Sequence, residues 1–251
     1  MILYCSKAAR SPIGFFICTG VFFVLVTFSV PVVCADPFLN VDFNTTTSPT
    51  ELGPPAFSSF VISGTPVTEA VGYSTSPTIT SGETTITLSS SGTTLRSFDG
   101  HNPSDSGGFT FGELYRDYVT TSGQNAILQI QVSGLNPNTD YRFTFYAYNP
   151  LSSVGITNRF TNTTGGVQPS TSGTIIEDWT ASISSNEQFA LTMDAVADGS
   201  GVVTFAEAPL ANPPYQTVRL NGLQIAVPEP SVFALVIVGI SGLLAVRRRV
   251  N

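Results

Sequence analysis

Apolar and polar residues alternate one by one through much of this chain, and this alternation limits the folds open to it. Leu128, Ile130 and Val132 are separated by single glutamines, and Phe143 and Phe145 by a threonine. The same period of two recurs at residues 39–43, 85–88, 189–193 and 203–205. Successive side chains of a β-strand point to opposite sides, so this period predicts strands with one buried face. We therefore expect an all-β fold.

Turn-forming residues separate these strands at the intervals typical of a sandwich. Examples are Ser81-Gly82, Asn136-Pro137-Asn138 and the segment 198–201. The sequence predicts an antiparallel β-sandwich of roughly eight to ten strands. In the last strand, residues 218–225, the apolar residues change parity at Asn221-Gly222, which predicts a β-bulge.

The first 35 residues are typical of a signal peptide. Lys7 and Arg10 precede an almost wholly apolar run, residues 13–30. Val33-Cys34-Ala35 fits the small-residue rule for cleavage before Asp36. A lipoprotein with a lipidated Cys34 is less favoured, because Val33 is bulky. Cleavage would remove all three cysteines of the chain, which leaves no disulfide and no thiolate metal ligand.

The last 25 residues consist of Pro228-Glu229-Pro230, an apolar run at 231–246 and Arg247-Arg248-Arg249. As a helix the run would span about 24 Å, somewhat less than the roughly 30 Å hydrocarbon core, and snorkelling arginines can extend its reach. The positive-inside bias places the C-terminus in the cytoplasm and the segment before Pro228 across the membrane. The sequence therefore predicts a C-terminal transmembrane helix.

This three-part tail resembles the PEP-CTERM sorting signal of Gram-negative bacteria. The resemblance implies that the helix holds the protein in the inner membrane. It also implies that an exosortase, a membrane protease and transpeptidase, recognises Pro-Glu-Pro during delivery to the cell surface or extracellular matrix. An ordinary single-pass anchor is the alternative. The expected organisation is a signal peptide at 1–35, an ectodomain at 36–226 and a sorting signal at 227–251.

The predicted ectodomain is strongly acidic. It contains no lysine, and its five arginines stand against sixteen Asp and Glu residues, a formal net charge of −11. Such a charge disfavours nucleic acid and anionic lipid as partners. It suits an extracellular protein that is kept soluble by repulsion.

The segment from Leu135 to Tyr141 matches the Leu-x-Pro-x-Thr-x-Tyr pattern of a tyrosine corner. We expect a buried Tyr141 hydroxyl that is hydrogen-bonded to backbone near Asn136 or Pro137. The motif resembles the penultimate strand of a fibronectin type III domain, but too much chain follows it, so a larger jelly roll fits better. The whole span resembles galactose-binding-like sandwiches, through short motifs at 38–43, 114–119, 134–141 and 219–225.

The sequence contains few residues in patterns typical of catalytic sites. His101 is the only histidine, so a His-based metal cluster is excluded and a Ser-His-Asp triad would depend on that one residue. No Gly-x-Ser-x-Gly elbow is present to place a nucleophile. Carboxylates such as Glu177-Asp178 leave a glycan hydrolase open. We predict a non-enzymatic protein.

Two groups of residues are candidates for binding. Asp99, Asn102 and Asp105 offer oxygen ligands at short spacing and predict a calcium site, the alternative being a solvated loop. The resemblance to jelly-roll sandwiches also implies a structural calcium ion.

A sugar site needs an aromatic surface with polar groups beside it. The candidates are Tyr146 and Tyr148, which are expected to face outward, and Trp179; ordinary packing is the alternative. We predict an exported β-sandwich in an exopolysaccharide or biofilm matrix that binds carbohydrate, with a purely structural or adhesive protein as the alternative.

Overall fold

The computed structural model describes residues 38–45, 49–61, 71–73, 76–91, 95–99, 103–105, 107–122, 126–148, 156–165, 171–177, 183–210 and 217–228. This part of the chain contains fifteen strands and no helix, which confirms the all-β prediction. The strands outnumber those expected because several, such as β3 (Val71–Tyr73), are too short to show alternation in the sequence. No helix within the described residues is long and apolar enough to cross a membrane. The predicted signal peptide and the predicted C-terminal transmembrane helix lie outside these residues.

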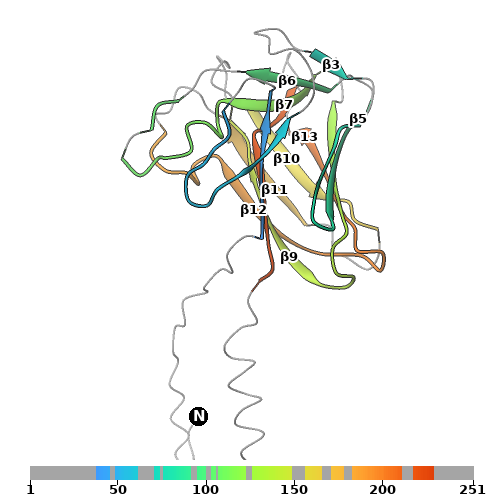
Figure 1. The fold of residues 1–251 in the computed structure, drawn as a ribbon. Coiled ribbons are helices and arrows are strands. Elements are labelled where there is room, and N and C mark those ends of the chain that lie inside the picture. Colours follow the sequence, from blue (N-terminus) through green and yellow to red (C-terminus); the bar gives the residue numbers. More distant parts are fainter. Residues whose placement is uncertain are drawn as a thin grey trace, which may run out of the picture. The chain divides into compact units, whose positions relative to one another are not determined.

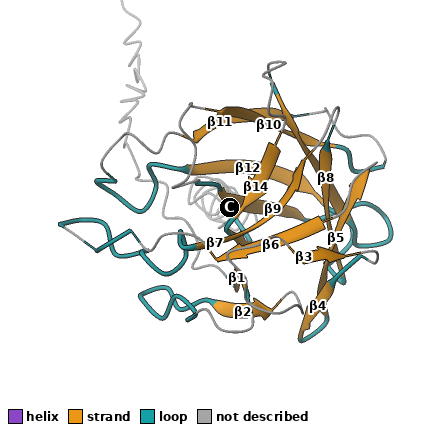
Figure 2. Cartoon of the chain, turned by 90° about the horizontal axis from the view of Figure 1, so that it is seen from above, coloured by secondary structure: helices purple, strands orange, loops and turns teal. Residues whose placement is uncertain are grey.

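Two large sheets face each other (Figures 1 and 2). The five-stranded sheet has the order β12 (Ala190–Val196), β9 (Asp140–Tyr146), β15 (Gly222–Ala226), β1 (Leu39–Asn44) and β2 (Ser58–Val61). The six-stranded sheet has the order β11 (Ser172–Glu177), β10 (Ile156–Asn162), β13 (Val203–Pro209), β8 (Ile127–Ser133), β5 (Thr84–Ser91) and β4 (Thr78–Ser81). A smaller sheet contains β14 (Thr217–Leu220), β7 (Asp117–Ser122), β6 (Leu95–Asp99) and β3. Every pairing between two of the described strands is antiparallel except that of β1 with β2.

Aromatic side chains fill the space between the two large sheets. Phe143 and Phe145 of β9 each lie with their ring centroid 4.9 Å from that of Phe205 on β13. Phe145 also stacks on Phe160 of β10 at 4.6 Å. From β8 to β15 the chain passes repeatedly between the two sheets, as in a jelly roll. The antiparallel jelly-roll sandwich expected from the sequence is therefore the fold of this protein.

The parity change near the end of the domain has a cause other than the predicted bulge. β14 pairs with β7 in the small sheet, whereas β15 pairs with β9 and β1 in the five-stranded sheet. Asn221 lies between them and is fully buried. Since the two halves of the segment belong to different sheets, they bury side chains of opposite parity.

The predicted tyrosine corner is confirmed. The backbone N–H of Asn136 donates to the Tyr141 hydroxyl at 2.9 Å, and the ring of Tyr141 is buried. Gly134 precedes the corner with φ +78°, and a Cβ there would lie 1.8 Å from the carbonyl oxygen of Glu83. Only glycine fits this close approach, which joins the β4–β5 and β8–β9 turns.

Candidate functional site

The two tyrosines predicted to form an exposed sugar platform are buried. Tyr146 lies on the side of β9 opposite Phe143 and Phe145, as its parity predicts, but Tyr146 and Tyr148 are only 4% and 5% exposed and belong to the buried hydrophobic cluster. The ring of Tyr115 lies 6.0 Å from that of Tyr146 and 5.7 Å from that of Tyr148, and Phe189 packs on Tyr148 at 4.7 Å. The expectation of an exposed aromatic pair is therefore wrong. Trp179, the third candidate, lies outside the described residues.

The covering segment is 107–116, which crosses the outer side of the five-stranded sheet. Its Phe109, Phe111 and Tyr115 are buried, and the Tyr115 hydroxyl donates to the carbonyl oxygen of Asn186 at 2.8 Å. A Cβ at Gly222 would lie 2.5 Å from Leu114, so this glycine lets the segment approach the sheet. Burial raises the pKa of Tyr115 and of Tyr146. The closely spaced aromatics Phe109, Phe111 and Tyr115 are the sequence signal that could have predicted this cover, and they belong to the same buried cluster as Phe143 and Phe145.

A buried carboxylate, Asp42, lies in the five-stranded sheet close to two other acidic residues, Glu51 and Asp117. Asp42 of β1 is fully buried and accepts a hydrogen bond from the backbone N–H of Glu51 at 2.8 Å. The amide of Asn44 lies 2.6 Å from the same carboxylate, and with its nitrogen on that side it donates to Asp42. Burial, with the nearby charges of Asp117 and Glu51, raises the pKa of Asp42 to about 8 against these hydrogen bonds.

The predicted calcium ligands have protein partners where they are described. Asp99 accepts from Arg116 at 2.8 Å, a pairing that raises the pKa of Arg116. Asp105 accepts from the backbone N–H of Gly112 at 3.0 Å. Asn102 and His101 lie outside the described residues. Among those residues, no three His, Cys, Asp or Glu side chains are grouped so that they could hold a metal ion, and calcium stays a prediction.

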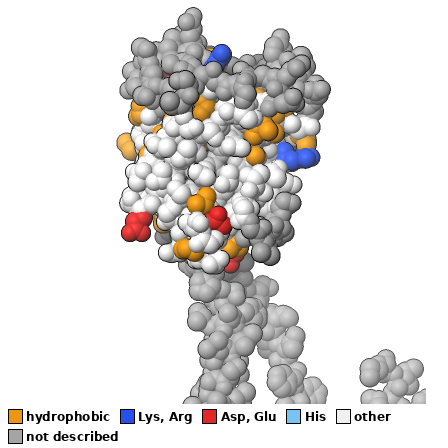
Figure 3. Space-filling view, turned by 90° about the vertical axis from the view of Figure 1, so that its right-hand side faces the viewer, with side chains coloured by type: hydrophobic (Ala, Val, Ile, Leu, Met, Phe, Trp, Pro, Cys, Tyr) orange, Lys and Arg blue, Asp and Glu red, His pale blue; other side chains and the backbone are white. Residues whose placement is uncertain are grey.

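The outer side of the six-stranded sheet is polar and almost free of charge. Its outward positions follow from the burial alternation along the strands and from their register. We call this surface the polar face; its side chains are Thr78, Thr80, Thr85, Thr87, Ser89, Ser91, Ile127, Gln129, Gln131, Ser133, Thr204, Ala206, Ala208, Thr157, Arg159, Thr161, Ser172 and Thr174. Arg159 is the one charged side chain among them. Figure 3 views the side where β4 and β5 lie in Figure 2; white, which marks the backbone and the side chains that are neither hydrophobic nor charged, covers most of its described surface, with a few acidic and basic side chains.

Side chains of the polar face line up in rows across the strands. One row runs from Ser89 through Gln129, Ala206 and Thr161 to Ser172, each the register partner of the next. At about 4.8 Å between neighbouring strands, five strands span about 19 Å. The face therefore offers hydroxyl and amide groups along a line long enough for several units of a polymer. Sequence reasoning missed this surface because its residues come from six separate strands.

The sorting motif follows directly on the last strand. β15 ends at Ala226, and Val227 and Pro228 are the last described residues. Glu229, Pro230 and Arg247 to Arg249 lie outside the described part of the chain, so the sorting signal stays a prediction.

No family model matches this chain, and no curated protein matches it either. Solved structures with a similar fold include TmCBM61 in complex with beta-1,4-galactotriose, at 8% identity and TM-score 0.33, covering 57% of this chain and 88% of that one. Another is the CBM22-1 xylan-binding domain of Xyn10C from Paenibacillus barcinonensis, at 10% identity and TM-score 0.37, covering 57% and 87%. A third is the enzymatically active domain of bacteriophage CBA120 tailspike protein 4, at 10% identity and TM-score 0.26, covering 58% and 18%. Likeness at this level does not bear on the ligand of this chain.

Proposed function

We propose that this protein is an exported, non-enzymatic β-sandwich that binds neutral polysaccharide in an extracellular or biofilm matrix. The observation that carries the proposal is the polar face. On a domain with a formal net charge of −11, the described outward side chains of an entire six-stranded sheet include a single charge. Hydroxyl and amide groups donate to and accept from sugar hydroxyls without favouring a charged ligand.

Binding through such a face is expected to be weak at each contact. A protein–sugar hydrogen bond replaces hydrogen bonds to water, so its net contribution is about 1 kcal/mol. The described side chains of the face include no aromatic ring to add stacking energy. Copies of the protein that are held together on a membrane or in a matrix would bind one polymer with avidity, because later contacts form at high effective concentration. We therefore expect retention on polymers and little affinity for short oligosaccharides.

Export and sorting belong to the same proposal. A signal peptidase would cut before Asp36, and an exosortase would recognise Pro228-Glu229-Pro230 while the apolar run holds the chain in the inner membrane of a Gram-negative bacterium. Two features support this reading: the residue pattern of the tail, and the end of the last strand at Ala226, which leaves the motif directly beyond the final strand.

The proposal is tested by affinity electrophoresis of the full chain, in neutral detergent, through gels that contain a neutral or an acidic polysaccharide. Gln129→Glu combined with Gln131→Glu places two charges at the centre of the polar face, on exposed positions that do not need repacking. We expect at least a fivefold loss of retardation by the neutral polymer. Thr192→Glu, an exposed change on the outer side of the other sheet, is the matched control and should leave retardation unchanged. Equal retardation of all three proteins would reject the polar face as the binding surface.

Calcium forms a separate arm of the proposal. If Asp99, Asn102 and Asp105 hold the ion, it would let acidic polymers bind, and chelation would abolish that binding. Asp105→Asn should then remove the calcium effect while leaving neutral binding intact. The ion would have to compete with Arg116 for Asp99 and with the Gly112 N–H for Asp105.

A purely structural matrix or adhesion protein is the second candidate. The burial of Tyr146 and Tyr148 favours it, because these side chains serve packing and not sugar stacking. Absence of retardation by every polysaccharide tested, with a normally folded protein, would select this function.

A further inference from the structure

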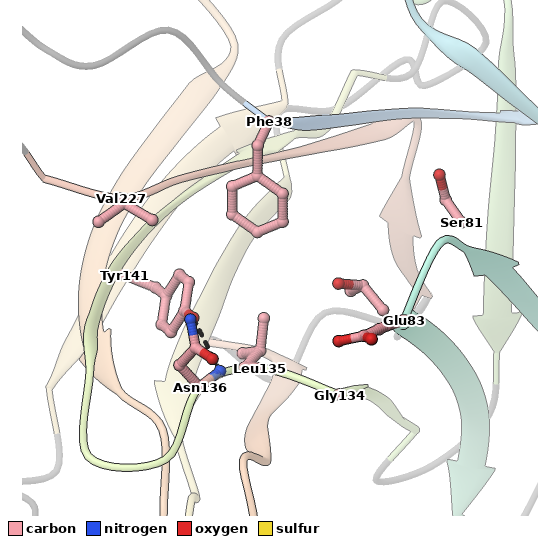
Figure 4. A pocket seen from close by; sticks show the side chains of 9 residues that line it. Phe38, Ser81, Glu83, Gly134, Leu135, Asn136, Tyr141 and Val227 are labelled. Carbon is pink, nitrogen blue, oxygen red and sulfur yellow. Dashed lines mark hydrogen bonds between the residues drawn. The ribbon is translucent and has the colours of Figure 1, made fainter.

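An open pocket of about 370 Å³ lies where the two ends of the folded domain meet (Figure 4). Phe38, just before β1, and Val227, just after β15, line one side of it. The β4–β5 turn contributes Ser81 and Glu83, and the β8–β9 turn contributes Asn136. The volume is within the range of small-ligand sites.

The lining combines aromatic rings with a single carboxylate. Phe38 and Tyr141 lie edge to face with their ring centroids 6.0 Å apart, and Figure 4 shows the Phe38 ring directed into the opening that Glu83 borders. No lining residue is a cation. Within the described part of the chain, no hydrogen bond or ion pair occupies the Glu83 carboxylate. An aromatic face and a carboxylate both attract an ammonium group.

The exposure of Phe38 also needs an explanation. Phe38 is 49% exposed and Val227 is 42% exposed, although both line the same pocket as the buried Tyr141. An apolar rim around a carboxylate suits a ligand that is part apolar and part cationic. A lipid with an ammonium headgroup has this chemistry.

Chain length favours a lipid as the source of the ammonium group. The predicted membrane run begins four residues after Val227, a distance of at most about 14 Å when fully extended. While the chain is anchored, the pocket is therefore held near the headgroup layer. The acidic domain would be repelled by anionic lipid but not by a zwitterionic headgroup.

We propose that this pocket binds the ammonium group of a zwitterionic membrane lipid, with Glu83 as the ion-pair partner and Phe38 and Tyr141 as the aromatic wall. The site orients the domain on the membrane while the tail is inserted, and in this respect it rests on the proposed anchor. Gly134 shapes the site, because its backbone packs on that of Glu83 where no side chain would fit.

The test places the full chain in bilayer nanodiscs of phosphatidylcholine, with and without phosphatidylethanolamine. A water-soluble carbodiimide activates carboxylates, and a primary amine held against one displaces the urea and forms an amide. Mass spectrometry of the peptides should show a phosphatidylethanolamine adduct on Glu83, at least five times more often than on the exposed Glu187. Phosphatidylcholine, which has no primary amine, should give none.

Glu83→Gln should abolish the adduct, and Phe38→Ala should reduce it several-fold, with thermal unfolding of both variants unchanged. Adducts spread evenly over exposed carboxylates would overturn the site. In a further arm, free ethanolamine is added in detergent without lipid. If it shows the same preference for Glu83 over Glu187 as the lipid does, that result would reject a lipid as the ligand and indicate a site for soluble amines. Failure of the chain to stay in the nanodisc would contradict the anchor, and the soluble arm would still report on the pocket.

Discussion

At the scale of single residues, this domain depends on buried polar groups that have defined partners. Tyr141 and Asn136 form the corner between β8 and β9 through one hydrogen bond. Asp42 is held by the Glu51 backbone and the Asn44 amide in a site without a neighbouring cation among the described residues. The Tyr141–Asn136 hydrogen bond stabilises a turn, whereas the buried Asp42 carboxylate lowers the free energy of unfolding by an amount that depends on pH.

Tyr141→Phe should lower the free energy of unfolding by about 1 kcal/mol, because the Asn136 N–H loses its acceptor while the ring still packs. Urea unfolding followed by circular dichroism measures the difference. Polysaccharide retardation should not change, since the corner is not part of the polar face. An unchanged unfolding midpoint would show that water replaces the hydroxyl at no cost.

Asp42 should make stability depend on pH. Its pKa is about 8 in the folded protein and near the ordinary 3.8 after unfolding, so the folded state holds the proton more tightly. The contribution of protonated Asp42 to the free energy of unfolding is fully present below about pH 4 and is lost as the pH rises towards 8. Over this range the free energy of unfolding falls with a slope that approaches 1.4 kcal/mol per pH unit. Urea unfolding at several pH values, in buffer without divalent cations, measures it.

Asp42→Asn cannot titrate and keeps an oxygen for the Glu51 N–H, so it should remove this slope. Asp194→Asn is the control, because Asp194 is largely exposed and pairs with Arg142 at the surface. The same slope in the wild type and in Asp42→Asn would assign the pH dependence to other groups.

At the scale of elements, the passage of the chain from β14 to β15 joins two sheets through one asparagine. Asn221 donates its backbone N–H to the carbonyl of Tyr146 at 2.8 Å and accepts from the Phe43 N–H at 2.9 Å. Its side chain accepts from the Tyr148 N–H and donates to the Asp117 carbonyl, both at 2.6 Å. Every polar group of the residue is therefore used where strands of two sheets meet.

Asn221→Ala removes a buried partner from both Tyr148 and Asp117, at about 1–3 kcal/mol each. We expect the free energy of unfolding to fall by about 2–6 kcal/mol, measured by urea unfolding. Asn40→Ala is the control, since the half-buried Asn40 has one described bond, to the Ala56 carbonyl, and should cost about 1 kcal/mol or less. Equal effects of the two changes would contradict the role of Asn221 as a junction.

At the scale of the whole molecule, the strands of the sandwich end before the predicted membrane tail begins, and part of the acidic charge is buried within the sandwich. Asp42, Glu51, Asp117 and Glu207 are buried, so the surface is less acidic than the formal charge implies. The final strand, β15, lies between β9 and β1 in the five-stranded sheet and ends at Ala226. The sandwich is complete before the sorting motif begins.

Removal of residues 227–251 should therefore leave cooperative thermal unfolding with a midpoint shifted by less than about 2 °C. Removal of 222–251 is the matched control, because it also deletes β15 and its hydrogen bonds to both neighbours, and should abolish cooperative unfolding. Circular dichroism against temperature distinguishes the two. Surface retention in cells should be lost with the shorter deletion; a melted domain after that deletion would contradict the separation of fold and tail.

The sequence alone determined the all-β class, the longer alternating strands with the sides that they bury, and the tyrosine corner. Alternation is a local property of strand geometry: Phe143 and Phe145 had to share one side, and Arg142 and Thr144 the other. The Leu135-to-Tyr141 motif likewise encodes its hydrogen bond within seven residues. Absence of cysteine and lysine between Asp36 and Ala226 is read directly.

Only the tertiary structure decided which outward side chains reach solvent. Tyr146 faces outward by its parity, but Tyr115, far along the chain, packs over it and buries it. The rows of the polar face arise because register brings Ser89, Gln129 and Thr161 together from separate strands. Alternation predicts to which side of its strand a residue points. It does not predict which residue lies beside it on the next strand or which segment packs over it, because both depend on contacts between distant segments.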